Sequence, residues 1–204
     1  MAAKPEYDFD LNDKPIIFVF GGPGSGKGTQ CEKIAKHYQY AHLSSGDLLR
    51  DELKSGSDLS NEIKVLMEQG KLVPLDIVLK MIHNRMMQLK DETKGYLIDG
   101  YPRDTHQAEE FEKAIGVPDL LIYYEVSDKT MTERLLNRAL MSGRADDNEE
   151  TIKKRLVVFH EQTVPVLQYY EPKKKVAMIA AEDTIDNIFT KTKAAIDVLA
   201  DKLY

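Results

Sequence analysis

The chain has 204 residues, 42% of them hydrophobic and 30% charged, which is typical of one globular domain with a sizeable core. Its formal net charge of −6 argues against a nucleic-acid binder or a membrane-surface protein, because both are expected to be basic. No apolar run is long enough to span a bilayer, and the single cysteine excludes a disulfide framework, so we expect a cytoplasmic protein.

The first segment, residues 1–14, reads MAAKPEYDFDLNDK. It lacks the apolar stretch of a secretory signal, and it is too acidic for a transit peptide. We therefore expect a short N-terminal extension ahead of a domain that covers residues 15–204.

A β-branched and aromatic run at residues 16–20 predicts a buried strand, and the sequence GGPGSGKG follows it directly. From Gly26 onward the apolar residues take helical spacing. A strand, a glycine-rich loop with a lysine, and a helix in this order are the context of a P-loop. Glycines let backbone N–H groups turn inward around phosphate, and Lys27 can reach the outer phosphates of a nucleotide.

The residue after Lys27 is Gly28, whereas the general motif has serine or threonine there; the hydroxyl comes one position later, at Thr29. Position 28 therefore cannot ligate magnesium directly, and a metal would depend on phosphate oxygens, water and carboxylates elsewhere. In the following helix, Cys31 is expected to be a small core hydrophobe rather than a reactive thiol. The five histidines show no metal-ligand spacing, so surface or packing roles are expected for them.

Further apolar runs at residues 40–43, 96–98, 120–126 and 176–180 predict four more strands, with helical patterns between and after them. This alternation favours an α/β fold with a mainly parallel sheet. Two segments between strands, residues 44–73 and 137–147, are interpreted as small inserts.

The sequence YLIDGYPR, residues 96–103, has an acidic residue at the end of a buried strand. P-loop proteins hold a carboxylate near magnesium at such a position, so Asp99 is a candidate metal-site residue that acts through water. The alternative is that Asp99 caps the next helix. Arg103 follows at the carboxyl edge of the sheet, where open α/β sheets bind ligands and where arginine offers a bidentate fork for phosphate.

Five motifs, GGPGSGKGTQ, HLSSGDLLR, GKLVPL, LIDGYPR and SGRADDNEETIKKRL, together resemble the nucleoside monophosphate kinases, and most of all the short-lid adenylate kinases of the cytosolic isoenzyme 1 type. The resemblance extends from residue 15 to the C-terminus. It implies a P-loop NTPase fold, a five-stranded parallel sheet flanked by helices, with residues 44–73 as the NMP-binding insert and residues 137–147 as the short lid. It also implies reversible in-line transfer, Mg-ATP + AMP = 2 ADP, in adenine nucleotide homeostasis, by a monomer that takes up Mg²⁺ with its ATP.

The same resemblance implies the site residues by position. The ATP-binding residues would be Gly24, Ser25, Gly26, Lys27, Gly28, Thr29, Arg138 and Asp183. The AMP-binding residues would be Ser45, Arg50, Lys71, Leu72, Val73, Gly100, Tyr101, Pro102, Arg103, Gln107, Arg144 and Arg155. The catalytic residues would be Lys27, Arg103, Arg138, Arg144 and Arg155, and the lid carboxylates would be Asp146 and Asp147, which tie its closed form to arginines.

The resemblance also implies which base is bound, because adenylate kinases read the adenine edge with a glutamine four residues after the YPR arginine, and Gln107 stands there. A glutamine amide can pair bidentately with adenine. The related UMP/CMP kinases carry Asn directly after that arginine, where this chain has Asp104, and Ala where this chain has Ser45. These residues favour AMP. A UMP/CMP kinase and a nucleotide-binding module without catalysis are the alternatives, whereas a GTPase-type switch would need an NKxD motif, which the chain lacks.

The chain departs from the family pattern in its lid, which opens RALMSGR instead of RGETSGR. It departs again at Asp183, which stands where the family often has a glycine whose backbone packs on the ATP adenine. The lid contains no cysteine, so the structural zinc of some longer-lid relatives is not expected.

Overall fold

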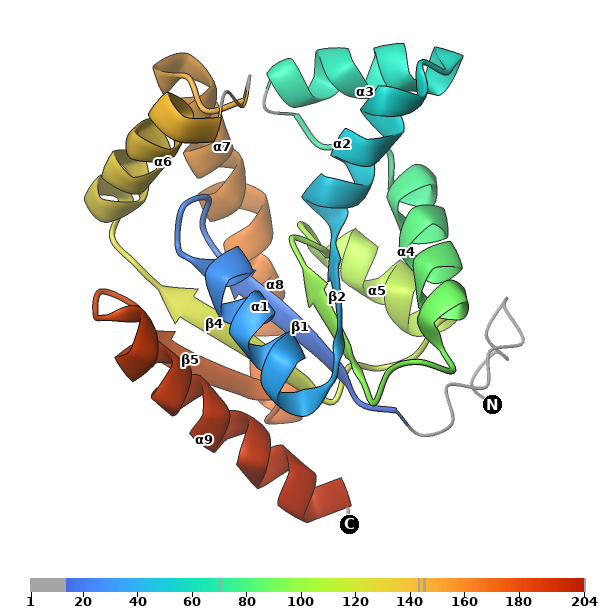
Figure 1. The fold of residues 1–204 in the computed structure, drawn as a ribbon, viewed down its shortest axis with the longest axis vertical. Coiled ribbons are helices and arrows are strands. Elements are labelled where there is room, and N and C mark those ends of the chain that lie inside the picture. Colours follow the sequence, from blue (N-terminus) through green and yellow to red (C-terminus); the bar gives the residue numbers. More distant parts are fainter. Residues whose placement is uncertain (1–13, 70, 143, 145, 204) are drawn as a thin grey trace.

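The computed structural model describes residues 14–69, 71–142, 144 and 146–203 (Figure 1). Of the expected N-terminal extension, residues 1–14, only Lys14 is among them, and two positions of the expected lid, 143 and 145, lie outside them. Across the described residues, no helix is long and apolar enough to cross a membrane.

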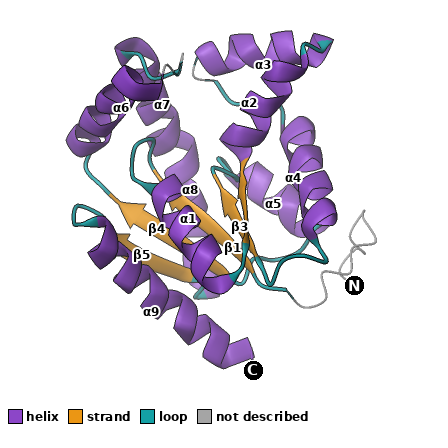
Figure 2. Ribbon diagram, viewed as in Figure 1, coloured by secondary structure: helices purple, strands orange, loops and turns teal. Residues whose placement is uncertain are grey.

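Five strands form one parallel sheet in the order β2-β3-β1-β4-β5, which confirms the predicted α/β fold (Figure 2). Their bounds are β1 Ile16–Gly21, β2 Ala41–Ser44, β3 Tyr96–Asp99, β4 Leu120–Glu125 and β5 Val176–Ala180. β1 is central, with β3 and β2 on one side and β4 and β5 on the other. The loop after β1 therefore lies where the strand order changes direction, which is where open α/β sheets bind ligands.

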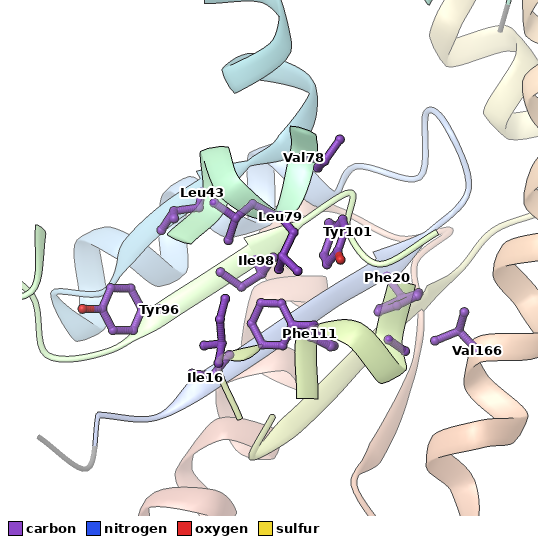
Figure 3. Close-up of a cluster of buried hydrophobic side chains, with 14 of the residues drawn as sticks. Ile16, Phe20, Leu43, Val78, Leu79, Tyr96, Ile98, Tyr101, Phe111 and Val166 are labelled. Atoms are coloured by element: carbon purple, nitrogen blue, oxygen red, sulfur yellow. The ribbon is translucent and has the colours of Figure 1, made fainter. Parts of the chain in front are cut away.

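Alternate residues of each strand face opposite sides of the sheet. From β1, Phe18 and Phe20 enter one buried cluster, whereas Ile17 and Val19 enter a second cluster on the other face. The first cluster includes Phe111 (Figure 3). Its ring packs edge-on against that of Phe18, with 4.8 Å between the ring centroids. The sheet is therefore covered by apolar side chains on both faces, as its near-continuous apolar strands require.

The helices have the bounds α1 Lys27–Tyr38, α2 Ser45–Ser55, α3 Asp58–Glu68, α4 Leu75–Leu89, α5 Thr105–Ala114, α6 Asp128–Ser142, α7 Glu149–Val158, α8 Val164–Tyr170 and α9 Ile185–Leu203. The first cluster packs against α4, α5 and α8, and the second against α1 and α9. A π-helical turn, Phe159–Thr163, joins α7 to α8. A short 3₁₀ turn, Glu171–Lys173, follows α8.

Two helix pairs, α2 with α3 and α6 with α7, stand at the same end of the molecule as the loop between β1 and α1 (Figure 1). They touch each other, since Thr151 Oγ1 on α7 donates a hydrogen bond of 3.1 Å to the Glu68 carbonyl on α3. The expected NMP-binding insert is α2 and α3 with the residues that follow. The expected lid begins within a helix, since its residues 137–142 are the last turns of α6.

Candidate functional site

A cleft of about 570 Å³ opens at the carboxyl ends of β1 and β3, between the sheet and the two helix pairs. Its size is that of a small-molecule site. The predicted site residues that line it are Gly24, Gly26, Lys27, Gly28, Thr29, Ser45, Arg50, Lys71, Leu72, Val73, Asp99, Gly100, Tyr101, Pro102, Arg103, Gln107, Arg138, Arg144, Asp146 and Arg155. The cleft therefore brings together motifs that are up to 131 positions apart in the sequence, from Gly24 to Arg155.

The glycine loop between β1 and α1 has the backbone that phosphate binding needs. Gly24 and Gly26 have φ of +83° and +93°, a region that L side chains rarely adopt. Gly22 is required for another reason, because a Cβ there would lie 2.2 Å from the Met131 sulfur. The backbone N–H groups at the start of α1 then point into the cleft with the positive end of the helix dipole.

Lys27 lies at the first position of α1 and turns back over the loop. Its ammonium group donates hydrogen bonds to the carbonyls of Gly21 at 2.7 Å and Gly22 at 2.9 Å. Burial lowers the Lys27 pKa to about 8, against the opposing effect of Asp99, and Arg103 lowers it further. Binding of an anion would stabilise the charged form of such a buried lysine, because the anion supplies negative charge in surroundings from which burial has removed water.

Asp99 ends β3 and is buried against the cleft with 7% of its surface exposed. Its Oδ2 lies 3.3 Å from His42 Nε2 on β2. The alternative role is wrong: Asp104, not Asp99, caps α5, because its Oδ1 accepts a hydrogen bond of 2.7 Å from the Gln107 N–H. Asp99 is therefore a carboxylate that faces the cleft.

Arg103 and Gln107 are positioned by each other. The Arg103 N–H donates to Gln107 Oε1 at 2.9 Å, so the amide oxygen faces the backbone and the amide nitrogen is directed elsewhere. Arg103 Nε donates to the Gly100 carbonyl at 2.8 Å, and Ser45 Oγ donates to the same carbonyl at 2.7 Å. These contacts tie the start of α2 to the turn after β3.

Arg103 resembles Lys27 in its surroundings. Burial lowers its pKa to about 10, and Arg155 lowers it further. Its carbonyl accepts a hydrogen bond of 2.7 Å from Thr163 Oγ1, in the π-helical turn between α7 and α8. We call Lys27 and Arg103 the core cations; within the described part of the chain, neither forms an ion pair.

Two arginines of the opposite wall share one carboxylate of α2. Arg50 donates to Asp47 Oδ1 through Nε at 3.2 Å and Nη2 at 2.5 Å, and Arg144 Nη2 lies 3.7 Å from the same oxygen. Burial by itself would raise the Asp47 pKa, but the hydrogen bond and charge of Arg50 hold it below its ordinary range. The contact between Arg144 and Asp47 joins the expected lid to the expected NMP-binding insert.

Two further arginines share a buried carboxylate at the end of the expected lid. Arg138 donates to both oxygens of Asp147, at 2.6 and 2.7 Å, and Arg155 Nη1 donates to Oδ1 at 3.0 Å. Asp146 Oδ2 lies 3.0 Å from Arg155 Nη1. The Asp147 hydrogen bond raises the Arg138 pKa. We call the four paired residues the insert arginines: Arg50, Arg138 and Arg144 belong to the two expected inserts, and Arg155 belongs to α7, directly after the expected lid.

Three predicted site residues do not line the cleft. Ser25 is buried inside the glycine loop, and Asp147 lies behind the arginines that it holds. Asp183 is turned to the start of α9, where it accepts hydrogen bonds from the Thr184 N–H at 2.7 Å and from Asn187 Nδ2 at 2.8 Å. The Asp183 side chain is therefore occupied outside the cleft.

Sequence reasoning missed three residues that the cleft contains, namely His42, Asp47 and Arg134. Arg134 donates to the carbonyls of Ser25 at 3.4 Å and Ala181 at 3.1 Å, which links the glycine loop to the end of β5. Its position four residues before Arg138 indicates the same helix face, so this residue was predictable once residues 128–142 were read as one helix.

The arrangement suits a reaction that moves a charged group between two anions. Phosphoryl transfer needs in-line positioning and neutralised charge more than covalent help. The cleft supplies an anion-binding loop, two core cations and four insert arginines around one space.

The family model for adenylate kinase matches residues 19–175, a range that contains every residue lining the cleft. Adenylate kinase isoenzyme 1 of Cyprinus carpio is 54% identical over 189 residues, which cover 93% of this chain and 97% of that protein. The Homo sapiens protein of the same description is 51% identical with the same coverage. The one from Caenorhabditis elegans is 50% identical over 190 residues, which cover 93% of this chain and 90% of that protein.

Proposed function

The chain belongs to the adenylate kinase family and is a phosphotransferase that catalyses the reversible reaction ATP + AMP = 2 ADP, and we propose that both nucleotides bind in the cleft between the core and the two helix pairs. The observation that supports this assignment most is the position of the core cations. Lys27 and Arg103 lie in one cleft, buried, with lowered pKa values and without ion pairs within the described residues.

The ATP phosphates are assigned to the glycine loop, from Gly24 to Thr29. Lys27 now donates to two carbonyls of its own loop, and phosphate oxygens would take over those hydrogen bonds. An ammonium group that moves with the transferred phosphoryl group neutralises charge at each stage of the reaction. Asp183 would contribute to the ATP site through its backbone, since its side chain is bound to the start of α9.

The AMP phosphate is assigned to Arg50 and Arg103, with residues 71–73 and 100–102 along the same wall. Gln107 is assigned to the base. Because Gln107 Oε1 accepts from the Arg103 N–H, the amide has one fixed orientation and its nitrogen can donate to a ring nitrogen of adenine. Because of this hydrogen bond, recognition of the base and binding of the AMP phosphate both depend on Arg103 and Gln107.

The transferred group is assigned to Arg138, Arg144 and Arg155 together with the core cations. Their carboxylate partners are Asp47, Asp146 and Asp147. These ion pairs hold the arginines in position and balance their positive charge before a phosphate binds. Residues 44–73 as NMP-binding insert and residues 137–147 as lid would exclude water, which otherwise wastes ATP by hydrolysis.

The donors beside Lys27 fit magnesium, because the Asp99 carboxylate and the Thr29 hydroxyl are hard oxygen ligands that line the cleft. Family membership implies Mg-ATP use in general. We assign Asp99 to hold the ion through water, and the ion supplies neutralisation of phosphate charge when bound. We expect no structural zinc, because the chain has one cysteine and it lies outside the lid.

We further propose that the protein acts in the cytoplasm as a monomer, on ATP, AMP and ADP, without nucleic-acid or membrane partners. The acidic net charge of −6 and the single buried cysteine support this.

The test is ADP formation from Mg-ATP with AMP, CMP, UMP or GMP, each against a control without acceptor. We expect turnover with AMP alone and its loss in EDTA. A preference for CMP or UMP would leave the phosphate assignment standing and overturn the role of Gln107. ATP binding without transfer to any acceptor would contradict the assignment of the cleft as an active site.

Gln107→Ala tests base recognition directly. We expect the KM for AMP to rise about tenfold, as for a lost hydrogen bond of roughly 1.4 kcal/mol, and the preference for AMP over CMP to fall. Gln88→Ala, at an exposed position of α4, is the matched control and should change neither. An unchanged preference in Gln107→Ala would contradict the assignment.

A further inference from the structure

Three metal-ligating side chains meet on the α1 side of the sheet, next to the nucleotide cleft. Cys31 comes from α1, His42 from β2 and Asp99 from the end of β3. One ligand atom from each lies within 4.8 Å of the other two. In sequence they are 11 and 57 positions apart, so no spacing motif indicates them. His42 was expected to have a surface or packing role, and it lies beside Asp99 in the lining of the cleft.

The three atoms are near the geometry of a zinc site. Zn²⁺ bonds of about 2.0–2.3 Å in a tetrahedron separate the ligand atoms by roughly 3.3–3.8 Å. His42 Nε2 and Asp99 Oδ2 are already 3.3 Å apart. The Cys31 sulfur lies within 4.8 Å of a ligand atom from each of these residues, so a shift of about an ångström would bring it to the spacing of a tetrahedral site.

The ligand set is selective. A thiolate, an imidazole and a carboxylate favour Zn²⁺, Co²⁺ or Cd²⁺, whereas Mg²⁺ prefers oxygen ligands alone. His42 and Asp99 line the cleft and Cys31 is fully buried beneath them, so a metal held by the three has its fourth position toward the cleft. Three protein ligands with an open fourth position are also the arrangement in which zinc binds exogenous ligands.

We propose that Cys31, His42 and Asp99 form an inhibitory binding site for a borderline-soft divalent cation such as Zn²⁺ at the floor of the nucleotide cleft. Inhibition rests on the proposed function, because it follows from the role assigned to Asp99. A carboxylate that ligates Zn²⁺ no longer holds magnesium-bound water. It also no longer favours the charged form of Lys27 through its own negative charge.

Binding has a defined proton balance. Burial, and next to it the charge of Asp99, raises the Cys31 pKa, so the free protein holds the thiol protonated. Coordination forms the metal–sulfur bond and releases that proton to the buffer. A metal that bound without the thiol would release no such proton.

The direct test is equilibrium dialysis of the full chain with Zn²⁺ alone, and absorption spectroscopy with Co²⁺ alone. We expect one metal per chain and a sulfur-to-cobalt charge-transfer band. Cys31→Ser and His42→Gln should each weaken Zn²⁺ binding by more than about 100-fold, since loss of an outer-sphere partner alone costs roughly 10–100-fold. His37→Gln, an exposed histidine on the same helix as Cys31, should bind as the parent protein does.

Equal Zn²⁺ affinity in all these proteins, or a Co²⁺ complex without the sulfur band, would overturn the site. If Cys31→Ser fails to fold, the Co²⁺ spectrum of the unsubstituted protein still decides. Inhibition is tested separately, by loading one equivalent of Zn²⁺, measuring ADP formation from Mg-ATP and AMP, and repeating the assay after the zinc has been dialysed away. Full activity with zinc bound at the three residues would overturn the inhibitory role. Absence of ADP formation in the zinc-free protein with Mg-ATP and AMP would instead overturn the proposed function.

Discussion

The two walls of the cleft hold their positive charge in different ways. The core cations, Lys27 and Arg103, are fixed by hydrogen bonds to backbone carbonyls. The insert arginines are fixed by carboxylates, chiefly Asp47 and Asp147. Burial lowers the pKa of both core cations and also of Arg144, whereas the hydrogen bond to Asp147 raises the Arg138 pKa.

This difference implies that phosphate binding and the movement of the inserts over the cleft depend mainly on different cations. A phosphate that meets the core cations replaces weak carbonyl contacts and supplies missing charge, so binding there displaces no anion. A phosphate that meets an insert arginine must compete with or add to a carboxylate that already holds it. We therefore expect the core to provide most of the phosphate affinity and the inserts to respond to it.

The largest effect is expected from a core cation. Lys27→Met removes a charge aimed at the transferred group, and we expect kcat to fall by about 10²–10³-fold, as when one preorganised donor is removed from an active site. Lys33→Met, farther along α1 in an ion pair with Asp186, is the control and should keep its kcat. A fall of less than tenfold in Lys27→Met would contradict the division between core and inserts.

The next effect concerns stability at the lid. Asp147→Asn leaves Arg138 and Arg155 without their charged partner. We expect the free energy of unfolding in urea to fall by about 1–3 kcal/mol, less than for a fully buried pair because both arginines are partly exposed. Asp51→Asn, which breaks an exposed pair with Lys54, should change little. Equal losses in the two variants would show that Asp147 contributes no more than a surface pair.

The same carboxylate predicts an acid dependence. Burial alone would raise the Asp147 pKa, but the hydrogen bond and charge of Arg138, followed by Arg155, hold it below the ordinary 3.8. Its stabilisation is therefore complete above 3.8 and is lost as the pH falls through the lower folded-state pKa. The difference in the free energy of urea unfolding between the unsubstituted protein and Asp147→Asn should therefore become smaller from pH 7 to about pH 3. A difference that stays constant over this range would contradict the role of Asp147.

The smallest effect is expected at a carboxylate outside the cleft. Asp183 accepts from Asn187, Lys191 and the Thr184 N–H, and these contacts lower its pKa to about 2. Asp183→Gly should lower the Tm slightly and leave the KM for ATP unchanged. A changed KM with an unchanged Tm would show that this side chain acts on ATP.

The sequence predicted the five strands to within one residue at each end. The signal is clearest in β1, β3 and β4, whose mostly apolar residues are buried on both faces of the sheet. The secondary structure of residues 137–147 was not predicted from the sequence. Leu140 and Met141, within this expected lid, belong to α6, where both are largely exposed. Their helical propensity extends the helix where no buried face requires it.

The sequence by itself was enough to predict the glycine loop and its lysine. The backbone angles and the hydrogen bond of Lys27 that shape this loop lie within residues 21–27 and need no partner from a distant segment. It also predicted Arg103 and Gln107 as separate site residues, whereas the hydrogen bond between them is a finding of the structure. Only the tertiary structure decided that Asp147 holds Arg138 and Arg155, that Asp183 turns away from the cleft, and that Cys31, His42 and Asp99 meet. Such contacts depend on which faces of separate elements pack together, and that is fixed by burial of the whole core rather than by any local spacing.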